Sequence, residues 1–338
     1  MRVLLTGATG VIGPTVARAL RDEGHALRVL VRPGSDRARL AGLEVEFAAG
    51  DVAAPATLVD AMAGMDAVVH MAGLHDSWAP RRRDFFIFNL TGTRHIHATA
   101  RAAGARRLLF VSSGATIGAR RGAVGDERTQ RARGPLSAYE ASKLAAEQEL
   151  LAADAPPEIV VVNPASVYGP GDLAGNGQAI IGAVTGRLGV TTDVPTGFVY
   201  IEDLGRGIAA ALTRGRPRER YILCGQNISR LAFLRRAVEL AGVDRPLRAA
   251  VPKLWWVFAN IYGFQAWLAR RRPPISRDAV RIALHGYELD GSKAARELGL
   301  TYKTLDDGLD ATLDWLQDQG HVDLPAEPED AGDGLPAS

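Results

Sequence analysis

The chain has 338 residues, with 40 Lys and Arg side chains, 38 Asp and Glu side chains and a single cysteine, Cys224. Its length allows one large domain or two ordinary ones. The near balance of charge argues against a dedicated nucleic-acid-binding protein, which needs a strong basic excess. One cysteine excludes an intramolecular disulfide bond, and we expect no metal site.

The first predicted strand, residues 2–6, runs into the sequence TGATGVIG and a helix from about residue 12 to residue 22. Gly7 permits a tight turn, Gly10 lets the backbone approach a pyrophosphate, and Gly13 lets the helix pack closely. Free N–H groups at the start of the helix favour an anion there. The turn therefore predicts a dinucleotide site, which is completed by Thr9, Val11 and Ile12.

The second predicted strand, residues 26–31, ends at Arg32, where an NAD-binding protein usually carries an acidic residue. Ser35 and Arg37 follow it. Guanidinium and hydroxyl groups suit the 2′-phosphate of NADP, although Asp36 in the same loop would repel it. We therefore predict that the protein prefers NADP(H) to NAD(H). The alternative is that Arg32 is merely a solvated strand end.

Apolar runs and helical patterns continue to alternate along the chain. The further predicted strands are residues 45–49, 66–72, 106–113 and 158–163, and the further predicted helices are residues 84–103 and a helix from residue 137. Continuous apolar strands separated by helices are typical of a parallel sheet that is buried on both faces. The pattern predicts a doubly wound α/β fold, which is the Rossmann fold.

The helix from residue 137 begins with SAYEASK. Residues four apart lie on the same face of a helix, so Tyr139 and Lys143 point the same way. Pairs of this kind also meet by chance on many helices. The pair is a candidate chemical site that needs support from the rest of the chain.

The domain organisation changes after Tyr168, where glycine-rich loops and helices replace the regular alternation. We predict a cofactor-binding Rossmann domain at residues 1–168, completed by parts of residues 196–225. Residues 169–322 are expected to form a smaller, mainly helical substrate-binding lobe. Residues 323–338 are rich in Pro, Gly and acidic residues and are predicted to be disordered.

No stretch of the sequence has the apolar length that a membrane span requires, and the first residues enter a strand directly. We therefore expect a cytoplasmic protein. The most apolar segment, residues 253–272, is predicted to be a helix that covers an apolar pocket. Peripheral membrane contact through Arg270, Arg271 and Arg272 is the alternative interpretation.

Several strings together resemble one known family, the extended short-chain dehydrogenase/reductases. They are TGATGVIG, VLVRPGSDR, HMAGLHDSWAP, NLTGT, FVSS, YEASK, VNPASVYGPGD and FVYIEDL. The resemblance extends to about Trp315 and is closest to the dihydroflavonol-reductase-like branch, which includes bacterial hopanoid-associated sugar epimerases. The 3β-hydroxysteroid dehydrogenases are more distant relatives. The strings do not specify a substrate.

The resemblance implies a catalytic role for Tyr139, which would exchange a proton with the reacting oxygen. Lys143 would bind the nicotinamide ribose and lower the pKa of the tyrosine from its usual value near 10. An ammonium group about 5 Å away supplies on the order of 3 kcal/mol at an effective dielectric constant near 20. Ser113 would polarise the carbonyl, with Ser112 and Thr116 left open as alternatives.

The remaining implied roles concern support, cofactor and substrate. Asn89 matches the family asparagine that supports the catalytic helix. The implied cofactor contacts are Asp51 and Val52 at the adenine, Ala72 beneath the cofactor, and Pro164 and Val167 at the nicotinamide. The substrate candidates are His75, Trp78, Ser166 and Phe198. A homodimer is expected by analogy only.

Two positions separate the possible reactions. Nucleotide-sugar members of the family carry Asn where this chain has Ser166, and commonly carry Arg where it has Thr196 or Gly197. The substrate side is instead rich in aromatic residues: Trp78, Trp255, Trp256, Phe258, Tyr262, Phe264 and Trp267. Many of these could equally be ordinary core.

We therefore predict an NADP(H)-dependent oxidoreductase that interconverts an apolar ketone or aldehyde and its alcohol. The alternatives are a sugar epimerase or dehydratase without net redox change, a 3β-hydroxysteroid dehydrogenase, and a catalytically idle dinucleotide-binding protein. The Ser113, Tyr139 and Lys143 set argues against the last of these.

Overall fold

The structure is a computed structural model that describes residues 1–75, 79, 81–269 and 276–325. The predictions for Trp78, for Arg270, Arg271 and Arg272, and for residues 326–338 of the tail lie outside the described residues. The same is true of the side chains of Phe264 and Trp267.

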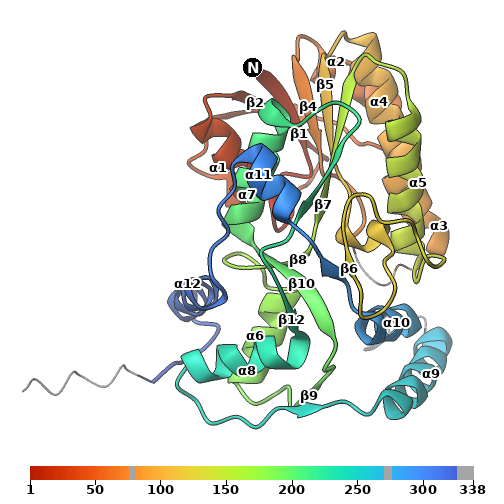
Figure 1. The fold of residues 1–338 in the computed structure, drawn as a ribbon. Coiled ribbons are helices and arrows are strands. Elements are labelled where there is room, and N and C mark those ends of the chain that lie inside the picture. Colours follow the sequence, from red (N-terminus) through yellow and green to blue (C-terminus); the bar gives the residue numbers. More distant parts are fainter. Residues whose placement is uncertain (76–78, 80, 270–275, 326–338) are drawn as a thin grey trace, which may run out of the picture.

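Within the described residues, the main sheet has seven strands in the order β11-β7-β5-β4-β1-β2-β3 (Figure 1). All neighbouring strands are parallel. The strands are β1 (Arg2–Thr6), β2 (Ala26–Val31), β3 (Val45–Ala49), β4 (Ala67–His70), β5 (Arg107–Val111), β7 (Glu158–Pro164) and β11 (Arg220–Leu223). The predicted doubly wound fold is confirmed.

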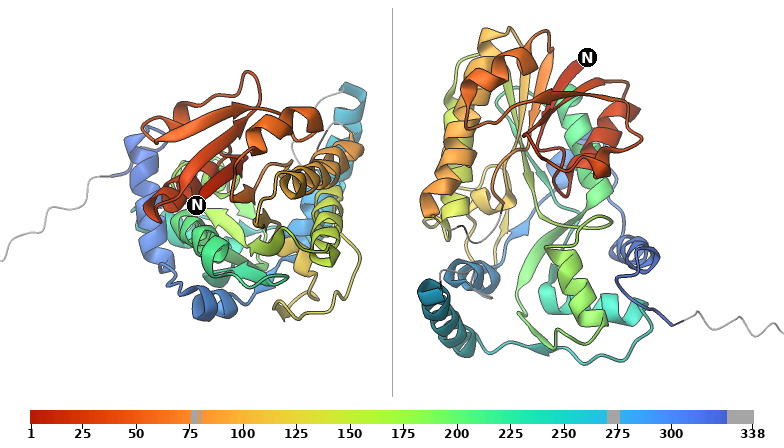
Figure 2. Two further views of the ribbon diagram at one scale, coloured as in Figure 1. Left: turned by 90° about the horizontal axis from the view of Figure 1, so that it is seen from above. Right: turned by 180° about the vertical axis from the view of Figure 1, so that it is seen from behind.

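Helices cover both faces of this sheet, which explains why its central strands are mostly apolar and buried (Figure 2). On one face α1 (Gly13–Asp22) packs against α7 (Ile201–Arg214). This approach needs Gly205, because a Cβ atom there would lie 2.9 Å from the Cγ2 atom of Thr15. The other face is covered by α4 (Gly92–Ala102) and α5 (Ala138–Ala152).

The helix predicted around residues 84–103 is a helical segment in three parts. A short α3 (Arg82–Phe85) leads into the π-helical turn η3 (Phe86–Thr91), and α4 follows directly. π-Helical turns are rare and frequently occur at functional sites. Here the turn buries Asn89, which is 1% exposed.

The lobe below the main sheet has its own three-stranded sheet, made of β8 (Ser166–Tyr168), β10 (Pro195–Tyr200) and β12 (Gln226–Ser229). The helices α6 (Asn176–Val184), α8 (Arg230–Leu240) and α12 (Leu305–Asp318) contribute to its core. Of the segment expected to complete the Rossmann domain, β11 is a strand of the main sheet and α7 packs on its face. β10 does not join this sheet, because it pairs with β8 and β12.

Aromatic residues form the centre of the lobe. The rings of Phe198 and Phe233 are stacked with centroids 4.3 Å apart, and Tyr168 meets Phe233 edge-on at 5.2 Å. Phe198 is fully buried in this cluster. The structure places the side chain in the core of the lobe, and the role predicted for it as a substrate residue stays a prediction.

The remaining α-helices and strands lie around the main sheet or extend the lobe. They are α2 (Val59–Met62), β6 (Val124–Gly125), β9 (Val190–Thr191), β13 (Arg248–Ala249), α9 (Pro252–Ala269), α10 (Arg277–His285), β14 (Glu288–Leu289) and α11 (Ser292–Leu298). α9 and α10 pack against each other at the end of the lobe that is far from α2 (Figure 1). Among the described residues, no helix combines the length and apolar character needed to cross a membrane.

Candidate functional site

The carboxyl ends of β1, β4, β5 and β7 face the lobe, and the predicted site residues gather at this edge. The turn after β1 approaches the loop after β4 closely. Gly7 has φ +79°, and a Cβ atom there would lie 2.8 Å from the backbone nitrogen of Ala72. The hydroxyl of Thr6 joins the two segments by accepting hydrogen bonds from Met71 N at 3.2 Å and Ala72 N at 3.1 Å.

The glycine turn packs tightly at Gly13 and is exposed at Gly10, where the sequence predicted a cofactor. A Cβ atom at Gly13 would lie 2.1 Å from the carbonyl oxygen of Ala8, so the start of α1 is folded tightly onto its own turn. Gly10 is exposed. No side chain caps the start of α1 at Ile12, which leaves backbone N–H groups of the first turn available to an anion.

The loop after β2 presents Arg32 to solvent. The carboxylate of Asp36, which would repel a phosphate, accepts a hydrogen bond from Ala38 N at 2.8 Å. The guanidinium of Arg37 lies 4.8 Å from the ring centre of Phe47. Ser35 N donates to the carbonyl oxygen of Arg32 at 3.1 Å and closes the turn. Within the described residues no ion pair involves Arg32, so its charge is free to meet a ligand.

The other predicted cofactor contacts lie at the ends of neighbouring strands. Asp51 accepts a hydrogen bond from Ala53 N at 2.8 Å, and Val52 is 6% exposed. Pro164 ends β7, and its carbonyl oxygen would lie 2.9 Å from a Cβ atom at Gly114. Val167, in β8, is half-buried beside it.

His70 supports this region from below and was missed by the sequence argument. Its Nδ1 atom lies 2.8 Å from the hydroxyl of Thr6, and its Nε2 atom lies 3.0 Å from the hydroxyl of Thr93. Burial, together with the smaller effect of the charge on Lys143, lowers the pKa of His70 to about 3. The ring is therefore a neutral bridge between β1 and α4.

The helix α5 holds the candidate catalytic pair. It begins at Ser137, whose hydroxyl accepts a hydrogen bond from Glu140 N at 3.1 Å and caps the helix. Tyr139 is half-buried, and its ring meets Phe85 edge-on with centroids 6.4 Å apart. Lys143 is 5% exposed and lies one turn further on.

The ammonium of Lys143 points to the end of β5. Its Nζ atom donates to the carbonyl oxygen of Val111 at 2.6 Å and lies 4.5 Å from the ring centre of Phe110. Burial lowers the pKa of Lys143 to about 8, while the charge of Glu147 opposes this change. The lysine is therefore close to the pH range in which it can lose its proton.

The expected lowering of the tyrosine pKa is not found in this structure. Burial raises the pKa of Tyr139, and a hydrogen bond with the hydroxyl of Ser113 lowers it in part. The charge of Lys143 is not among the causes. The physical reason is that the ammonium of the lysine is held by Val111 and Phe110, whereas the Ser113 hydroxyl is the polar group that acts on the phenol.

The hydrogen bonds of Ser113 differ from those of Ser112 and Thr116, the two alternative candidates for the hydroxyl that polarises the carbonyl. Ser112 and Thr116 donate to the Oε2 atom of Glu147 at 2.5 and 2.8 Å. The Oγ atom of Ser113 instead accepts a hydrogen bond from Ala115 N at 3.3 Å, and this hydroxyl lies near enough to the phenol of Tyr139 to lower its pKa in part. This geometry favours Ser113 as the group beside the reacting oxygen.

Glu147 organises a buried network that the sequence argument missed. Besides the two hydroxyls, it accepts a hydrogen bond from Asn163 Nδ2 at 2.9 Å and pairs with Arg220 at 3.2 Å. Its side chain is 2% exposed. A signal was present in YEASKLAAE, because Glu147 follows Lys143 by the same four residues that separate Lys143 from Tyr139.

Asn89 clamps the loop after β4 to the catalytic helix. Its Oδ1 atom accepts a hydrogen bond from Leu74 N at 2.7 Å, and its Nδ2 atom donates to the carbonyl oxygen of Leu74 and to Ser142 Oγ, both at 2.9 Å. Ser142 in turn donates to the carbonyl oxygen of Tyr139 at 2.8 Å. The predicted supporting contact is present, but Asn89 does not touch the side chain of Tyr139.

Ser166, a predicted substrate residue, has polar neighbours that the sequence did not reveal. Its hydroxyl accepts a hydrogen bond from Asn176 Nδ2 at 2.9 Å, and Arg230 donates to Asn176 Oδ1 at 3.0 Å. Burial lowers the pKa of Arg230, and the charge of Asp172 opposes this change. His75, another predicted substrate residue, is exposed in the loop after β4.

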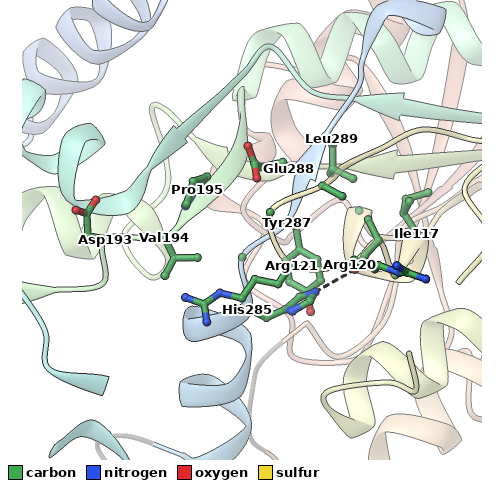
Figure 3. Close-up of a pocket in the computed structure, with 16 residues that line it drawn as sticks. Ile117, Arg120, Arg121, Asp193, Val194, Pro195, His285, Tyr287, Glu288 and Leu289 are labelled. Atoms are coloured by element: carbon green, nitrogen blue, oxygen red, sulfur yellow. Dashed lines mark hydrogen bonds between the residues drawn. The ribbon is translucent and has the colours of Figure 1, made fainter. Parts of the chain in front are cut away.

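A cavity of about 80 Å³ opens beside Gly114, the residue after Ser113 (Figure 3). Its walls are residues 117–123, residues 193–195 and residues 285–289. The ring of His285 faces the carbonyl oxygen of Ala119 at 3.1 Å. Among the described residues that line this cavity, none comes from α9, and the expectation that the aromatic residues of α9 surround the substrate stays a prediction.

A parallel sheet with a glycine turn after its first strand, and a Tyr/Lys helix at the carboxyl ends of the strands, defines a dinucleotide-binding α/β protein. Residues 3–224 match the NAD dependent epimerase/dehydratase family, and the chain belongs to this family. The predicted resemblance to the extended short-chain dehydrogenase/reductases is thereby confirmed.

Three similar proteins span nearly the whole chain. A sterol demethylase protein B of Methylococcus capsulatus is 30% identical, covering 95% of this chain and 100% of the relative. A putative dihydroflavonol 4-reductase of Synechocystis is 31% identical, covering 94% and 95%. The structure of a nucleoside-diphosphate-sugar epimerase from Pseudomonas aeruginosa is 29% identical with a TM-score of 0.75, covering 96% and 99%. The chain is thus an enzyme of a family that contains both reductases and epimerases.

Proposed function

We propose that the protein is an NADP(H)-dependent oxidoreductase that interconverts an apolar ketone or aldehyde and its alcohol. The observation that carries the proposal is the placement of the Ser113 hydroxyl, after β5, near the phenol of Tyr139 in α5, with Lys143 one turn along the same helix face. Two hydroxyls side by side at the carboxyl edge of the sheet form a suitable binding place for a carbonyl oxygen.

The residues present fit a dinucleotide. Side chains are excluded at Gly7 and Gly13 by neighbouring backbone, while Gly10 is exposed. The backbone of residues 9–12 would hold the pyrophosphate, and Pro164 and Val167 would border the nicotinamide. When bound, the cofactor supplies the hydride that is exchanged with the carbonyl carbon.

The protein's own contribution is to place and move the proton. Because burial raises the pKa of Tyr139, the phenol keeps its proton at neutral pH and can donate it to an oxygen held by Ser113. Lys143 would orient the ribose and return a proton to the site, which a pKa of about 8 permits. A protonated tyrosine favours the reductive direction.

The preference for NADP(H) is proposed from the loop after β2. Arg32 is exposed and has no ion-pair partner among the described residues, and the Asp36 carboxylate is engaged by a backbone N–H group. A 2′-phosphate would therefore meet a free guanidinium instead of a competing carboxylate.

The substrate class is proposed from the lobe and from the relatives. Thr196 and Gly197 offer no cation at the position where nucleotide-sugar enzymes of the family carry Arg. Two of the similar proteins carry names that refer to sterols and dihydroflavonols, which are largely apolar ring systems. An apolar carbonyl compound is therefore the first class to test.

A second candidate, a nucleotide-sugar epimerase or dehydratase, is favoured by one observation. Asn176 contacts Ser166 and Arg230 contacts Asn176, so an amide lies next to the position where the expected Asn is missing and a cation lies one residue further away. This arrangement offers partial compensation to a diphosphate. It weakens the argument from Ser166 alone but does not replace the missing Arg.

One experiment distinguishes the two candidates. NADPH consumption would be followed with aryl ketones, aldehydes and steroids, and binding of UDP- and dTDP-sugars would be measured by calorimetry. We expect consumption with at least one apolar carbonyl, and none with the Tyr139→Phe variant. Micromolar sugar-nucleotide binding that Arg230→Met abolishes, without NADPH consumption on any carbonyl, would establish the epimerase instead.

A further inference from the structure

The helix α9 exposes a continuous apolar face. Leu254, Val257, Phe258 and Ile261 are 53%, 52%, 45% and 47% exposed, respectively. Their spacing of three and four residues places all four on one side of the helix. Val251, just before the helix, is 55% exposed and continues the same stripe. Scattered apolar residues are normal on a surface, but a contiguous stripe marks an interaction site.

The opposite side of α9 is already occupied, so the exposed face is not the side that anchors the helix. Ala259 is fully buried, and Trp255 and Trp256 are half-buried. The guanidinium of Arg281 in α10 lies 6.0 Å from the ring centre of Trp256. The apolar stripe is therefore exposed to solvent on a helix that packs against α10.

Basic residues flank this stripe, and acidic ones are nearly absent. From Arg248 to Arg281 the sequence has one acidic residue, Asp278. Its carboxylate is paired with Arg281 at 3.3 Å. Arg248, Lys253 and Arg277 are exposed around the same end of the lobe. An apolar face with a cationic border complements a surface that is apolar within and anionic at its edge.

We propose that α9 docks on the surface of a membrane that carries anionic lipid headgroups. The apolar stripe would insert at the level of the headgroups, and the basic residues would meet lipid phosphates. A second copy of this chain is a poorer occupant. A two-fold contact through this face would place the basic borders opposite each other, where they repel.

The position of α9 gives this docking a consequence for the site. α10, which packs on α9, ends at His285, and His285 and Gly286 line the cavity beside Gly114. A docked protein would hold this cavity near the membrane, where apolar compounds are concentrated. The docking itself does not rest on the proposed reductase function, because it needs neither cofactor nor turnover.

The test is flotation of the full-length chain with vesicles. Phosphatidylcholine vesicles containing about 30% phosphatidylglycerol would be compared with pure phosphatidylcholine. We expect flotation with the anionic vesicles, and a loss of roughly tenfold or more in apparent affinity at high salt, because headgroup attraction is screened.

The variants separate the stripe from general surface effects. Leu254→Asp with Phe258→Asp should weaken vesicle binding at least about tenfold, and Lys253→Glu should weaken it less. The matched control is Val59→Asp, because Val59 is 60% exposed on α2, at the far end of the molecule (Figure 1). Circular dichroism would verify that each variant is folded.

Two results would overturn the proposal. One is the absence of flotation with anionic vesicles, or equal flotation of the wild type and the double variant. The other is a dimer in solution that the double variant converts to a monomer while vesicles bind neither form. In that case a second copy covers the face.

Discussion

The helices α5 and α9 reverse the usual distribution of residues in opposite ways. α5 buries charged side chains: Glu140, Lys143 and Glu147 are 0%, 5% and 1% exposed, respectively. α9 exposes apolar ones, including Leu254 and Phe258. Charged residues are almost never fully buried without partners, and exposed apolar stripes are uncommon in monomers. The buried charges of α5 and the exposed apolar residues of α9 are therefore both better explained by function than by stability.

The two departures differ in how they are compensated. Glu140 accepts charged hydrogen bonds from Arg131 at 2.7 Å and from Arg133 at 3.0 Å, and Glu147 pairs with Arg220. The stripe on α9 has no partner among the described residues. The buried charges of α5 have ionic partners inside the protein, which indicates a site that is complete within the chain. The exposed apolar side chains of α9 have none, which indicates a site that another molecule completes. The predictions below test this difference, beginning with the largest expected effect.

The strongest effect is expected at the phenol of Tyr139. Tyr139→Phe keeps the ring against Phe85 and removes only the proton donor, so turnover should fall about a hundredfold to ten-thousandfold. Cofactor affinity, measured by fluorescence titration, should change little. The control is Tyr262→Phe on α9, which should be neutral. Activity of the Tyr139 variant within about threefold of wild type would contradict its catalytic role.

The next effect concerns the buried charge of Glu147. Glu147→Gln leaves Arg220 without its ionic partner in a buried network, which should lower the free energy of unfolding by about 3–5 kcal/mol. Urea denaturation measures this change. Glu149→Gln is the matched control two residues further on, because its pair with Arg94 is half exposed and should contribute at most about 1 kcal/mol. Equal losses for the two variants would refute the distinction between buried and exposed charge.

The pH dependence of stability should report the burial of Lys143. The folded-state pKa of Lys143 is about 8, below its ordinary value of 10.5. Between these values the unfolded chain binds more protons than the folded one, so this group makes stability rise with pH, by up to about 3 kcal/mol. Below pH 8 both states are protonated and the contribution is constant.

This rise is isolated by comparison with Lys143→Met. Unfolding free energies of the two proteins would be measured at about pH 7 and about pH 10. The stability of the wild type relative to the variant should increase over this interval. A constant difference would mean that the buried ammonium carries no desolvation cost.

A smaller effect, on the preference for NADPH over NADH, is expected from replacing the exposed side chain of Arg32. A charge-assisted contact to the 2′-phosphate contributes roughly 1.5–3 kcal/mol, so Arg32→Asp should reverse a preference for NADPH of about ten- to a hundredfold. Dissociation constants for NADPH and NADH measure this ratio. Arg39→Asp, another exposed arginine in the same loop, is the control. A wild-type protein that binds both cofactors equally would show that Arg32 is only a solvated strand end.

The sequence predicted the first half of the chain well because its signals are local. The strands at residues 26–31 and 45–49 have the predicted bounds, since a short run rich in apolar residues between turn signals is sufficient to define a strand, although the second of them is largely exposed at the edge of the sheet. The glycine turn and the spacing of Tyr139 and Lys143 are equally local. The family of the chain followed from these same strings.

Other features depend on contacts between distant segments. The choice of Ser113 over Ser112 and Thr116 rests on Glu147, which comes from another element. Asn176 and Arg230 meet at Ser166 only because α6, α8 and β8 assemble in the lobe. The sequence also did not reveal that Phe198 stacks on Phe233 in the core, because an apolar strand residue looks the same whether it faces a ligand or an aromatic core.

The smallest effect is expected on the stability conferred by α9. Phe258 is 45% exposed, and its ring stacks on the ring of Tyr262 with centroids 6.2 Å apart. Phe258→Asp should therefore change the free energy of unfolding by no more than about 0.5–1 kcal/mol, in contrast to Glu147→Gln on α5. Thermal and urea unfolding of the protein without vesicles measure this. A loss of several kcal/mol would mean that the α9 face packs inside the protein, and the contrast between the two helices would fail. A stable variant that no longer binds vesicles would show that the face is maintained for binding and not for folding.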